Sequence, residues 1–307
     1  MPQINVTRSI TIHSPISDVY STLSDLNHWV KWSPWLVMEE GVDINISGDG
    51  KFYSWKGTRV GEGEMKVTLE NPNNSIEYDL TFLKPWKSEA NVKFLLSDNN
   101  DRTTVTWSMS SKLPFYLFWM KKMMEAYIGM DYERGLLLLK DYIEKGEVRS
   151  KLDFKGESTF AGTKYIGIKR DCAIDEMSNF MVTDFGKLET FIKDHSDITT
   201  NEAFTIYHKW DLIKRRSIYT SCIGVTMMPE NLPNDMVSGK IPKTKIYTLR
   251  HTGPYHHLGN AWSTLYNMHR GKEFKPIKGI DPFEKYVSDP QKTEEKNLIT
   301  DVIFPIH

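Results

Sequence analysis

The sequence predicts an α+β protein with two domains. Its 307 residues are too many for one ordinary domain, so two are expected. The first half shows alternating strand patterns followed by one long amphipathic helix, and the second half shows a strand–helix–strand–strand pattern twice. We expect domains at residues 1–148 and 158–307. The polar segment Glu147–Lys164 is the predicted linker or domain boundary.

The first domain is expected to begin with a strand and a helix. Apolar side chains alternate from Val6 to Ile12, as in a half-buried strand. Ser14 then suits the N-cap of a helix, and Pro15 suits its first helical position. The apolar face of this helix comprises Val19, Leu23 and Leu26.

Further alternating patterns, separated by turn sequences, predict an antiparallel meander. The predicted strands cover residues 65–69, 76–82, 90–96 and 105–109. Phe118–Glu144 follows as an amphipathic helix, and Gly146 is placed to end it. An antiparallel sheet capped by one long helix is an α+β domain, because the helix covers the open face of the curved sheet.

An incompletely closed sheet would leave a cavity under this helix. The helix carries several methionines, whose flexible side chains suit a surface that adapts to variable contents. We place Trp107, Met123 and Tyr127 on the walls of this predicted N-terminal cavity. The alternative is a filled core in which the methionines pack against their neighbours.

The second half nearly repeats itself. The segment Ala203–Tyr207 matches Pro282–Tyr286 at a spacing of 79 residues, and Ile223 matches Ile303 at a spacing of 80. So long a period, present only twice, predicts two copies of one small module and not a solenoid. Such a pair encloses a groove, where a small molecule is expected to bind.

Each module is expected to open with a strand and a helix. The strands are Tyr165–Arg170 and Ile246–His251. Asp175 is placed to cap the first helix, and Gly253–Pro254 opens the second. The repeated segments then supply two further strands to each module, which gives the pseudo-symmetric β-α-β-β pair.

The two copies differ at one position that carries chemistry. Glu284 and Tyr286 lie two residues apart on a predicted strand and therefore share one face. Their counterparts in the first module are Thr205 and Tyr207. If the two strands meet across a pseudo-two-fold axis, two tyrosines and one carboxylate converge on the groove.

Two roles are open for Glu284. As a charge partner it would hold a cationic or aromatic ligand, with Tyr207, Tyr255, Trp262 and Tyr286 as walls. As a desolvated carboxylate with a raised pKa it would act as a general base or acid. An outward-facing, solvated Glu284 would support neither role, and exposed glutamates are common.

No metal site and no cofactor are expected. The histidines at 251, 256, 257 and 269 lack a His-x-x-x-His spacing, and two adjacent histidines on a helix cannot both face one ion. The two cysteines, Cys172 and Cys222, form no CxxC spacing and are expected to be reduced. The glycines near residue 60 precede a strand pattern, which disfavours a phosphate-binding loop.

The net charge and the hydropathy of the sequence exclude some classes of binding partner. A formal net charge of -1 supplies no field that would attract nucleic acid or anionic lipid. The longest apolar run, Leu113–Met120, is far shorter than the ~20 residues of a spanning helix, and no signal-peptide pattern is present. We expect a cytoplasmic protein with a small-molecule ligand and with neither a nucleic-acid nor a membrane partner. The oligomeric state stays open.

Several short motifs run through residues 158–307. They are His251–Tyr255, Leu258–Gly259, Phe283–Tyr286, Asp289–Pro290, Thr300–Val302 and Pro305. In combination they resemble the gyrase-inhibitor-like family, also called the effector-binding domain of AraC- and MerR-type regulators. The resemblance implies two β-α-β-β modules around a ligand groove, and an acidic residue at the position of Glu284 that contacts cationic drugs. Some relatives instead hydrolyse cyclopropane-containing compounds with a carboxylate and aromatic residues.

Residues 3–146 carry a second, more diffuse set of motifs. They include Ser14–Pro15, Asp25–Leu26, Pro34–Trp35, Gly61–Gly63, Thr104–Trp107 and the long helix with Gly135–Leu136. This part resembles the START-like superfamily of polyketide cyclases, dehydrases and lipid-transport proteins, which implies a helix-grip fold around an apolar cavity. Regulators of the types named above carry a DNA-binding helix-turn-helix, whereas this chain has a START-like domain in that place. Direct DNA binding is therefore not expected.

We predict a small-molecule-binding protein that senses or sequesters its ligand. One alternative is a hydrolase or other detoxifying enzyme that acts on electrophilic compounds, with Glu284 as general base. Another is a non-catalytic regulatory protein that binds a second protein. The sequence alone leaves open whether any reaction is catalysed.

Overall fold

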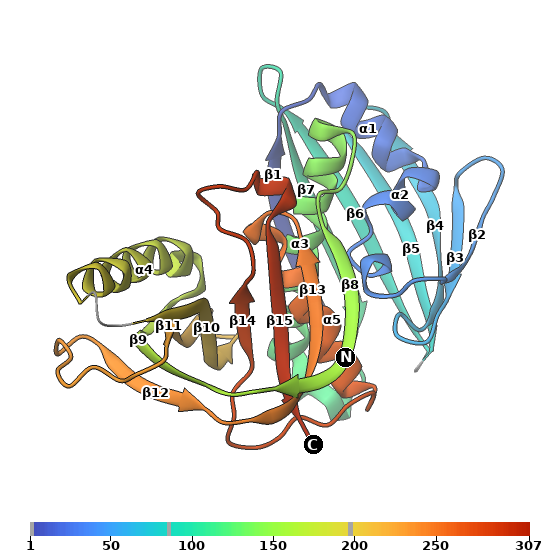
Figure 1. Cartoon of the computed structure of the whole chain (residues 1–307). Helices are drawn as coiled ribbons and strands as arrows, with labels where there is room; N and C mark the ends of the chain where they lie inside the picture. The colour runs from blue at the N-terminus through green and yellow to red at the C-terminus, as the bar shows by residue number, and fades with distance from the viewer. Residues whose placement is uncertain (1–2, 85–86, 196–198) are drawn as a thin grey trace. The chain divides into compact units, whose positions relative to one another are not determined.

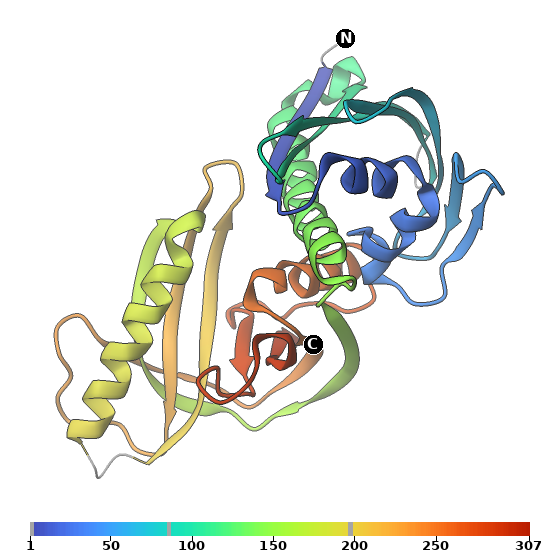
Figure 2. The same cartoon turned by 90° about the horizontal axis from the view of Figure 1, so that it is seen from above.

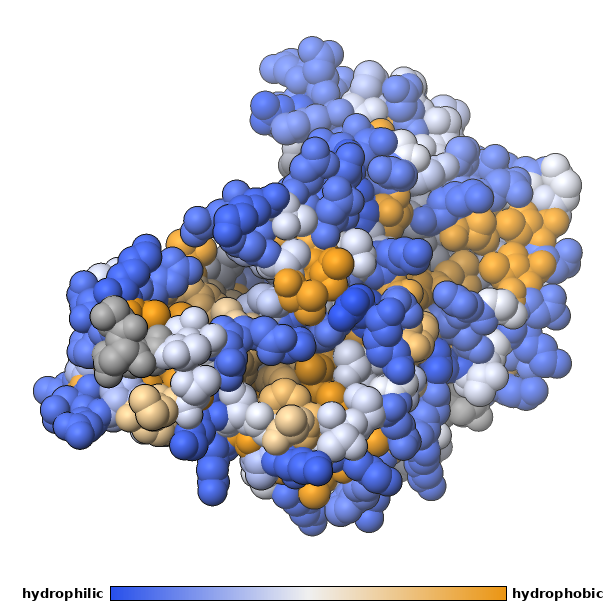
Figure 3. All heavy atoms as spheres, viewed as in Figure 1, coloured by the Kyte–Doolittle hydropathy of each residue, from blue (hydrophilic) through white to orange (hydrophobic). Residues whose placement is uncertain are grey.

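The chain folds into two units, each with its own sheet. The computed structural model describes residues 3–84, 87–195 and 199–307. The first unit is Met1–Ser150 and the second is Lys151–His307 (Figure 1). On the face shown in Figure 3, hydrophobic residues appear in small groups among hydrophilic ones. Within the described ranges, no helix is both long and apolar enough to cross a membrane.

The first unit is a seven-stranded antiparallel sheet with three α-helices in its described part. The strands are β1 (Gln3–Ile12), β2 (Asp43–Ile46), β3 (Phe52–Lys56), β4 (Glu62–Asn71), β5 (Ser75–Lys84), β6 (Ser88–Asp98) and β7 (Thr103–Lys112). They are ordered β1-β7-β6-β5-β4-β3-β2 across the sheet. The helices are α1 (Ile16–Ser24), α2 (Leu26–Trp32) and α3 (Lys121–Lys145), with 3₁₀ turns η1 (Leu36–Met38) and η2 (Phe115–Met120). The sheet curves around the helices, as the view in Figure 2 shows.

This arrangement confirms the predicted antiparallel sheet with a long C-terminal helix, and two helix starts are corrected. The helix α3 begins at Lys121 and not at Phe118, because the chain after Pro114 first forms a 3₁₀ turn, with Leu117 N–H donating to the Pro114 carbonyl at 2.9 Å. Ser14 does not cap α1 with its side chain; the helix begins at Ile16. The predicted end is confirmed, since Gly146 adopts a left-handed φ of 76° at the C-cap of α3.

The second unit is an eight-stranded antiparallel sheet. Its strands are β8 (Lys151–Phe160), β9 (Thr163–Ala173), β10 (Thr200–Asp211), β11 (Arg216–Val225), β12 (Val237–Ile241), β13 (Thr244–Thr252), β14 (Phe283–Tyr286) and β15 (Ile299–Ile306). Its helices are α4 (Met177–Asp194) and α5 (Gly259–Arg270), with short 3₁₀ turns η3 (Ile174–Glu176), η4 (Tyr255–His257) and η5 (Glu295–Asn297). The helix α4 packs on β9 and β11, and α5 packs on β13 and β15. Asp175 lies inside η3 and so does not cap α4 as predicted.

The order of the strands confirms the predicted pair of modules. It runs β12-β9-β11-β10-β14-β15-β13-β8, so that β9-α4-β10-β11 and β13-α5-β14-β15 face each other across the β10–β14 contact. The spacing of 79 holds there, because Thr205 lies opposite Glu284. The spacing of 80 for the last strand is wrong. Thr205 pairs with Ser221 and Glu284 pairs with Val302, which makes the spacing 81.

The segment Glu147–Lys164 contains the boundary between the two units, after Ser150, but most of it is not a linker. Residues Lys151–Phe160 form β8, which pairs with β13 along its length. Leu152 is buried and Phe154 is half-buried, and both pack on the core under α5. Their alternation with charged residues is a strand pattern that the surrounding polar composition conceals.

Candidate functional site

The site is built on the two strands at the centre of the eight-stranded sheet. Antiparallel pairing of β10 with β14 sets Thr205 opposite Glu284. Side chains alternate along each strand, so Thr205 and Tyr207 share the face of Glu284 and Tyr286. Helices α4 and α5 cover this face, because they pack on neighbouring strands of the same side.

The carboxylate of Glu284 is buried and accepts three hydrogen bonds. Glu284 is only 3% exposed to solvent. The Tyr207 hydroxyl donates to Oε2 at 2.8 Å, and the Tyr286 hydroxyl donates to the same oxygen at 3.2 Å. The Trp262 indole N–H, from α5, donates to Oε1 at 2.5 Å. All three donors are neutral, so the negative charge is solvated by the protein without being cancelled.

Burial is the largest influence on the pKa values of the acid and the tyrosines in this cluster. Desolvation raises the pKa of Glu284, although the three hydrogen bonds from Trp262, Tyr207 and Tyr286 each act to lower it. Burial and the nearby Glu284 charge raise the pKa of Tyr207 and of Tyr286 well above the ordinary value for tyrosine. The cluster therefore holds neutral tyrosines around one acid that protonates more readily than an exposed glutamate.

Aromatic rings form the outer part of the site. The Tyr286 hydroxyl also bonds the Thr205 hydroxyl at 2.9 Å. The rings of Tyr255 and Phe185 each pack edge-on against Tyr286, with centroids 5.7 Å away. Tyr255 is 37% exposed, so it marks the side of the cluster that meets solvent.

Two aromatic residues of this cluster, Trp210 and Phe185, were not anticipated from the sequence. Trp210 stacks on Tyr207 at 5.2 Å, although residues three apart on a regular strand lie on opposite faces. A register shift between Tyr207 and Lys209 turns Trp210 to the same side. Phe185 follows Met181 by four residues on the apolar face of α4, and that spacing was the available signal.

A second buried carboxylate on this face is already neutralised. Asp184, on α4, is fully buried, and Arg170 binds it through Nε at 3.0 Å and through a terminal nitrogen at 2.6 Å. The guanidinium also lies over the Phe180 ring, 5.2 Å from its centroid. Glu284, in contrast, forms no ion pair with any residue of the described part of the chain. Of these two buried carboxylates, only Asp184 is paired with a cation among the described residues.

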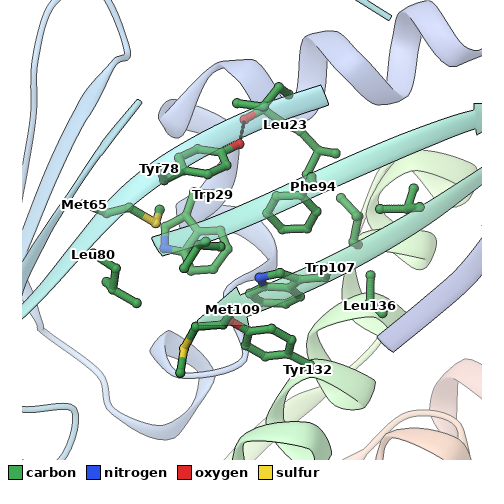
Figure 4. Packing of buried hydrophobic residues seen from close by; sticks show 14 of the residues in the cluster. Leu23, Trp29, Met65, Tyr78, Leu80, Phe94, Trp107, Met109, Tyr132 and Leu136 are labelled. Carbon is green, nitrogen blue, oxygen red and sulfur yellow. Dashed lines mark hydrogen bonds between the residues drawn. The ribbon is translucent and has the colours of Figure 1, made fainter. Parts of the chain in front are cut away.

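The predicted N-terminal site residues do not come together. Trp107 is buried in the core of the first unit, stacked on Tyr132 with ring centroids 3.9 Å apart (Figure 4). Trp29 and Trp32 pack edge-on against Trp107. Met123 and Tyr127 are not among the residues packed on this core, and Tyr127 is exposed. The rings of Trp29, Trp32 and Tyr132 thus surround Trp107, which was predicted to line a cavity.

Comparison with known families identifies both units. Residues 3–144 match the family of polyketide cyclases/dehydrases and lipid transport proteins, and residues 158–307 match the GyrI-like small molecule binding domain. The chain joins one domain of each kind. Comparison with the curated proteins gave no match.

Some solved structures are similar to parts of this chain, at low identity and low TM-score. The EcmrR–DNA complex is 15% identical, with a TM-score of 0.44, over 63% of this chain and 72% of that chain. The C-terminal domain of EcmrR is 18% identical, with a TM-score of 0.40, over 52% and 98%. The Aha1 dimer from Colwellia psychrerythraea is 20% identical, with a TM-score of 0.34, over 47% and 98%.

Within the GyrI-like domain, the structure gathers every predicted groove residue at one place. Glu284 contacts Tyr207, Trp262 and Tyr286 directly, and Tyr255 contacts Tyr286. The outward, solvated position considered for Glu284 is wrong, because the residue is buried. That this cluster is the ligand site, and that no metal or cofactor is needed, remain predictions.

Proposed function

We propose that the GyrI-like domain binds a lipophilic organic cation or a strongly polarised aromatic compound at Glu284. The observation that carries the proposal is a buried carboxylate with three neutral hydrogen-bond donors and no ion pair within the described residues. The match to a small molecule binding domain supports a small-molecule ligand, and the buried acid favours a cationic one.

The energetics favour a cation over a neutral ligand. A buried charge without a counter-charge is unfavourable by several kcal/mol, even when hydrogen bonds partly solvate it. A ligand cation next to Glu284 would remove most of that penalty. The faces of Tyr255, Tyr286 and Trp262 would add cation–π attraction, worth about 0.5–2 kcal/mol for each ring in contact.

The biological role that fits this chemistry is sensing or sequestration of the ligand. A cation that reaches Glu284 past Tyr255 has to rearrange the hydrogen bonds that join Tyr286 with Thr205 and Glu284. The Thr205–Tyr286 bond connects β10 with β14, so ligand binding would alter the contact between the two modules. Such a change would favour sensing over sequestration, because a protein that only stores the ligand would not need it.

Matched ligands test the charge preference directly. Benzyltrimethylammonium and its uncharged isostere neopentylbenzene would be compared by calorimetry and by thermal shift. We expect the cation to bind at least about tenfold more tightly, and this preference to disappear in Glu284→Gln. Glu294→Gln, at an exposed carboxylate in an ion pair with Lys296, is the control. Equal binding of the two compounds, or an unchanged preference in Glu284→Gln, would disprove the proposal.

A second candidate function has its own supporting observation. The raised pKa of Glu284, next to two hydroxyl donors, suits a general base or acid acting on an electrophilic compound. Hydrolysis of small electrophiles, such as strained-ring compounds and activated esters, would be assayed with the wild type and with Glu284→Gln. Turnover that survives in Glu284→Gln would exclude this role.

A further inference from the structure

A hollow lies on the opposite face of the eight-stranded sheet from Glu284. Side chains alternate along β14, so Phe283 and Lys285 point away from the face of Glu284 and Tyr286. Phe283 and Lys285 both line this hollow, which we call the back pocket. Its volume is about 650 Å³, which lies in the range of pockets that hold small organic molecules.

The floor of the back pocket is aromatic and aliphatic. The Phe283 ring lies 5.3 Å from the Phe160 ring and 6.1 Å from the Phe204 ring, measured between centroids. Ile246 and Ile303 complete the floor. Four of these five residues are buried and Phe160 is half-buried, so the floor is held rigidly by the core of the domain. It fits a flat or branched apolar group.

Two lysines lie on the rim of the back pocket. Lys285 Nζ is 3.0 Å from Glu202 Oε1, and Lys155 forms an ion pair with Asp153. Both acidic partners are exposed, and exposed ion pairs contribute only about 0–1 kcal/mol. The lysines can therefore exchange these partners for an anionic group of a ligand at small cost, with the released carboxylates returning to water.

The one buried acid that lines the pocket is not open to a cation. Arg250 binds Asp301 through two hydrogen bonds, of 2.7 and 2.9 Å, which fix and neutralise its carboxylate. The rim also holds hydroxyl and amide groups from Ser158, Thr159 and Asn201. Apart from the already paired acids, the charged groups on the rim are the two lysine ammonium groups, and the hydroxyl and amide groups can donate or accept hydrogen bonds.

We propose that the back pocket is a second small-molecule site, selective for an aromatic or branched apolar compound with a single carboxylate. The apolar body would lie on Phe283 and its neighbours, and the carboxylate would pair with Lys155 and Lys285. This site differs from the Glu284 site in its face of the sheet and in the sign of the charge that it selects. It does not depend on the function proposed for Glu284.

The test is calorimetric titration of the full chain with naphthalene-2-carboxylate and with the neutral naphthalene-2-carboxamide. We expect one saturable site that prefers the carboxylate. The double variant Lys155→Gln/Lys285→Gln should lower its affinity at least about tenfold. Lys292→Gln is the matched control, because Lys292 is 82% exposed and does not line the pocket. Thermal melts of all variants check that the fold is intact.

Glu284→Gln distinguishes the two sites. It should leave binding of the carboxylate to the back pocket within about twofold of the wild-type value, because its side chain lies on the other face of the sheet. The proposal is wrong if the carboxylate shows no saturable binding, if the double lysine variant binds as well as the wild type, or if Glu284→Gln abolishes binding.

Discussion

The hydroxyl of Tyr207 donates a 2.8 Å hydrogen bond to Glu284, 77 residues further along the chain. The contact has a counterpart across the pseudo-two-fold axis, where the Thr205 and Tyr286 hydroxyls lie 2.9 Å apart. In each case the first residue of one module's pair meets the second residue of the other module's pair. The two contacts differ only because a carboxylate replaces a hydroxyl in the second module. This single difference places one negative charge near the axis.

The pH dependence of stability should reveal that charge. Burial raises the pKa of folded Glu284 above its value in the unfolded chain. The folded state therefore binds more protons, and stability is lost as pH rises from about 4.5 through the raised pKa. Urea denaturation between pH 4 and 7 should show the wild type losing stability relative to Glu284→Gln. Parallel pH profiles for the two proteins would contradict a buried, charged Glu284.

Removal of the Tyr207 hydroxyl should destabilise the folded protein more when Glu284 is ionised than when it is protonated. Tyr207→Phe leaves the buried carboxylate with fewer donors, so we expect the free energy of unfolding at pH 7 to fall by about 1–3 kcal/mol. The loss should be smaller at pH 4, where protonation removes the charge. Tyr116→Phe, at a largely exposed tyrosine, serves as the control and should change nothing measurable. A loss independent of pH would mean that Tyr207 acts through packing alone.

Mutation of Arg170 and mutation of Asp184, which form an ion pair, should lower the free energy of unfolding by different amounts. Asp184 is fully buried, whereas about a third of the Arg170 side chain is exposed. Arg170→Gln leaves a buried carboxylate without its cation and should lower the free energy of unfolding by about 3 kcal/mol or more. Asp184→Asn leaves a guanidinium that water can reach, and we expect a loss of only about 1–2 kcal/mol. Chemical denaturation of both variants measures the difference, and the reverse order would refute this interpretation.

Two tryptophans of the first domain should differ sharply in their effect on stability. Trp107 is buried and stacked on Tyr132, so Trp107→Ala should destabilise this domain by about 3–5 kcal/mol. Trp119, in η2, is 67% exposed, and Trp119→Ser should change stability by less than about 0.5 kcal/mol. Differential scanning calorimetry of the full chain measures both. A large loss for Trp119→Ser would show that its ring packs against a surface.

Strand periodicity and the internal repeat predicted most of the fold and the centre of the site. A one-residue slip would turn every side chain of a strand to the other face, so the alternation at Glu284 and Tyr286 defines their shared side reliably. The repeat then places Thr205 opposite Glu284 without any knowledge of the turns. Burial of the acid follows from α4 and α5, which cover this face of the sheet, and the strand pattern alone does not predict it.

Features that depend on local irregularity were missed. Trp210 joins the cluster because of a register shift, and a shift of this kind leaves no mark in a two-residue pattern. The match of Ile223 with Ile303 is one residue off, since similar apolar side chains occupy both faces of the last strand and conceal the register. The polar composition of residues 147–164 predicts the boundary between the units but hides the strand β8, because charged residues flank its two core positions.

The strand β14 contains only four residues, with neighbours in β10 and β15 on its two sides. Phe283 and Lys285 therefore flank Glu284 directly along the chain. If an occupant of the back pocket displaced Phe283 or Lys285, the neighbouring Glu284 and Tyr286 would be displaced with them, and the reverse would also hold. In that case, thermodynamic reciprocity would require occupants of the two faces to change each other's affinity by the same factor. A single layer of strands would then couple the binding of a cation on one face to the binding of a carboxylate on the other.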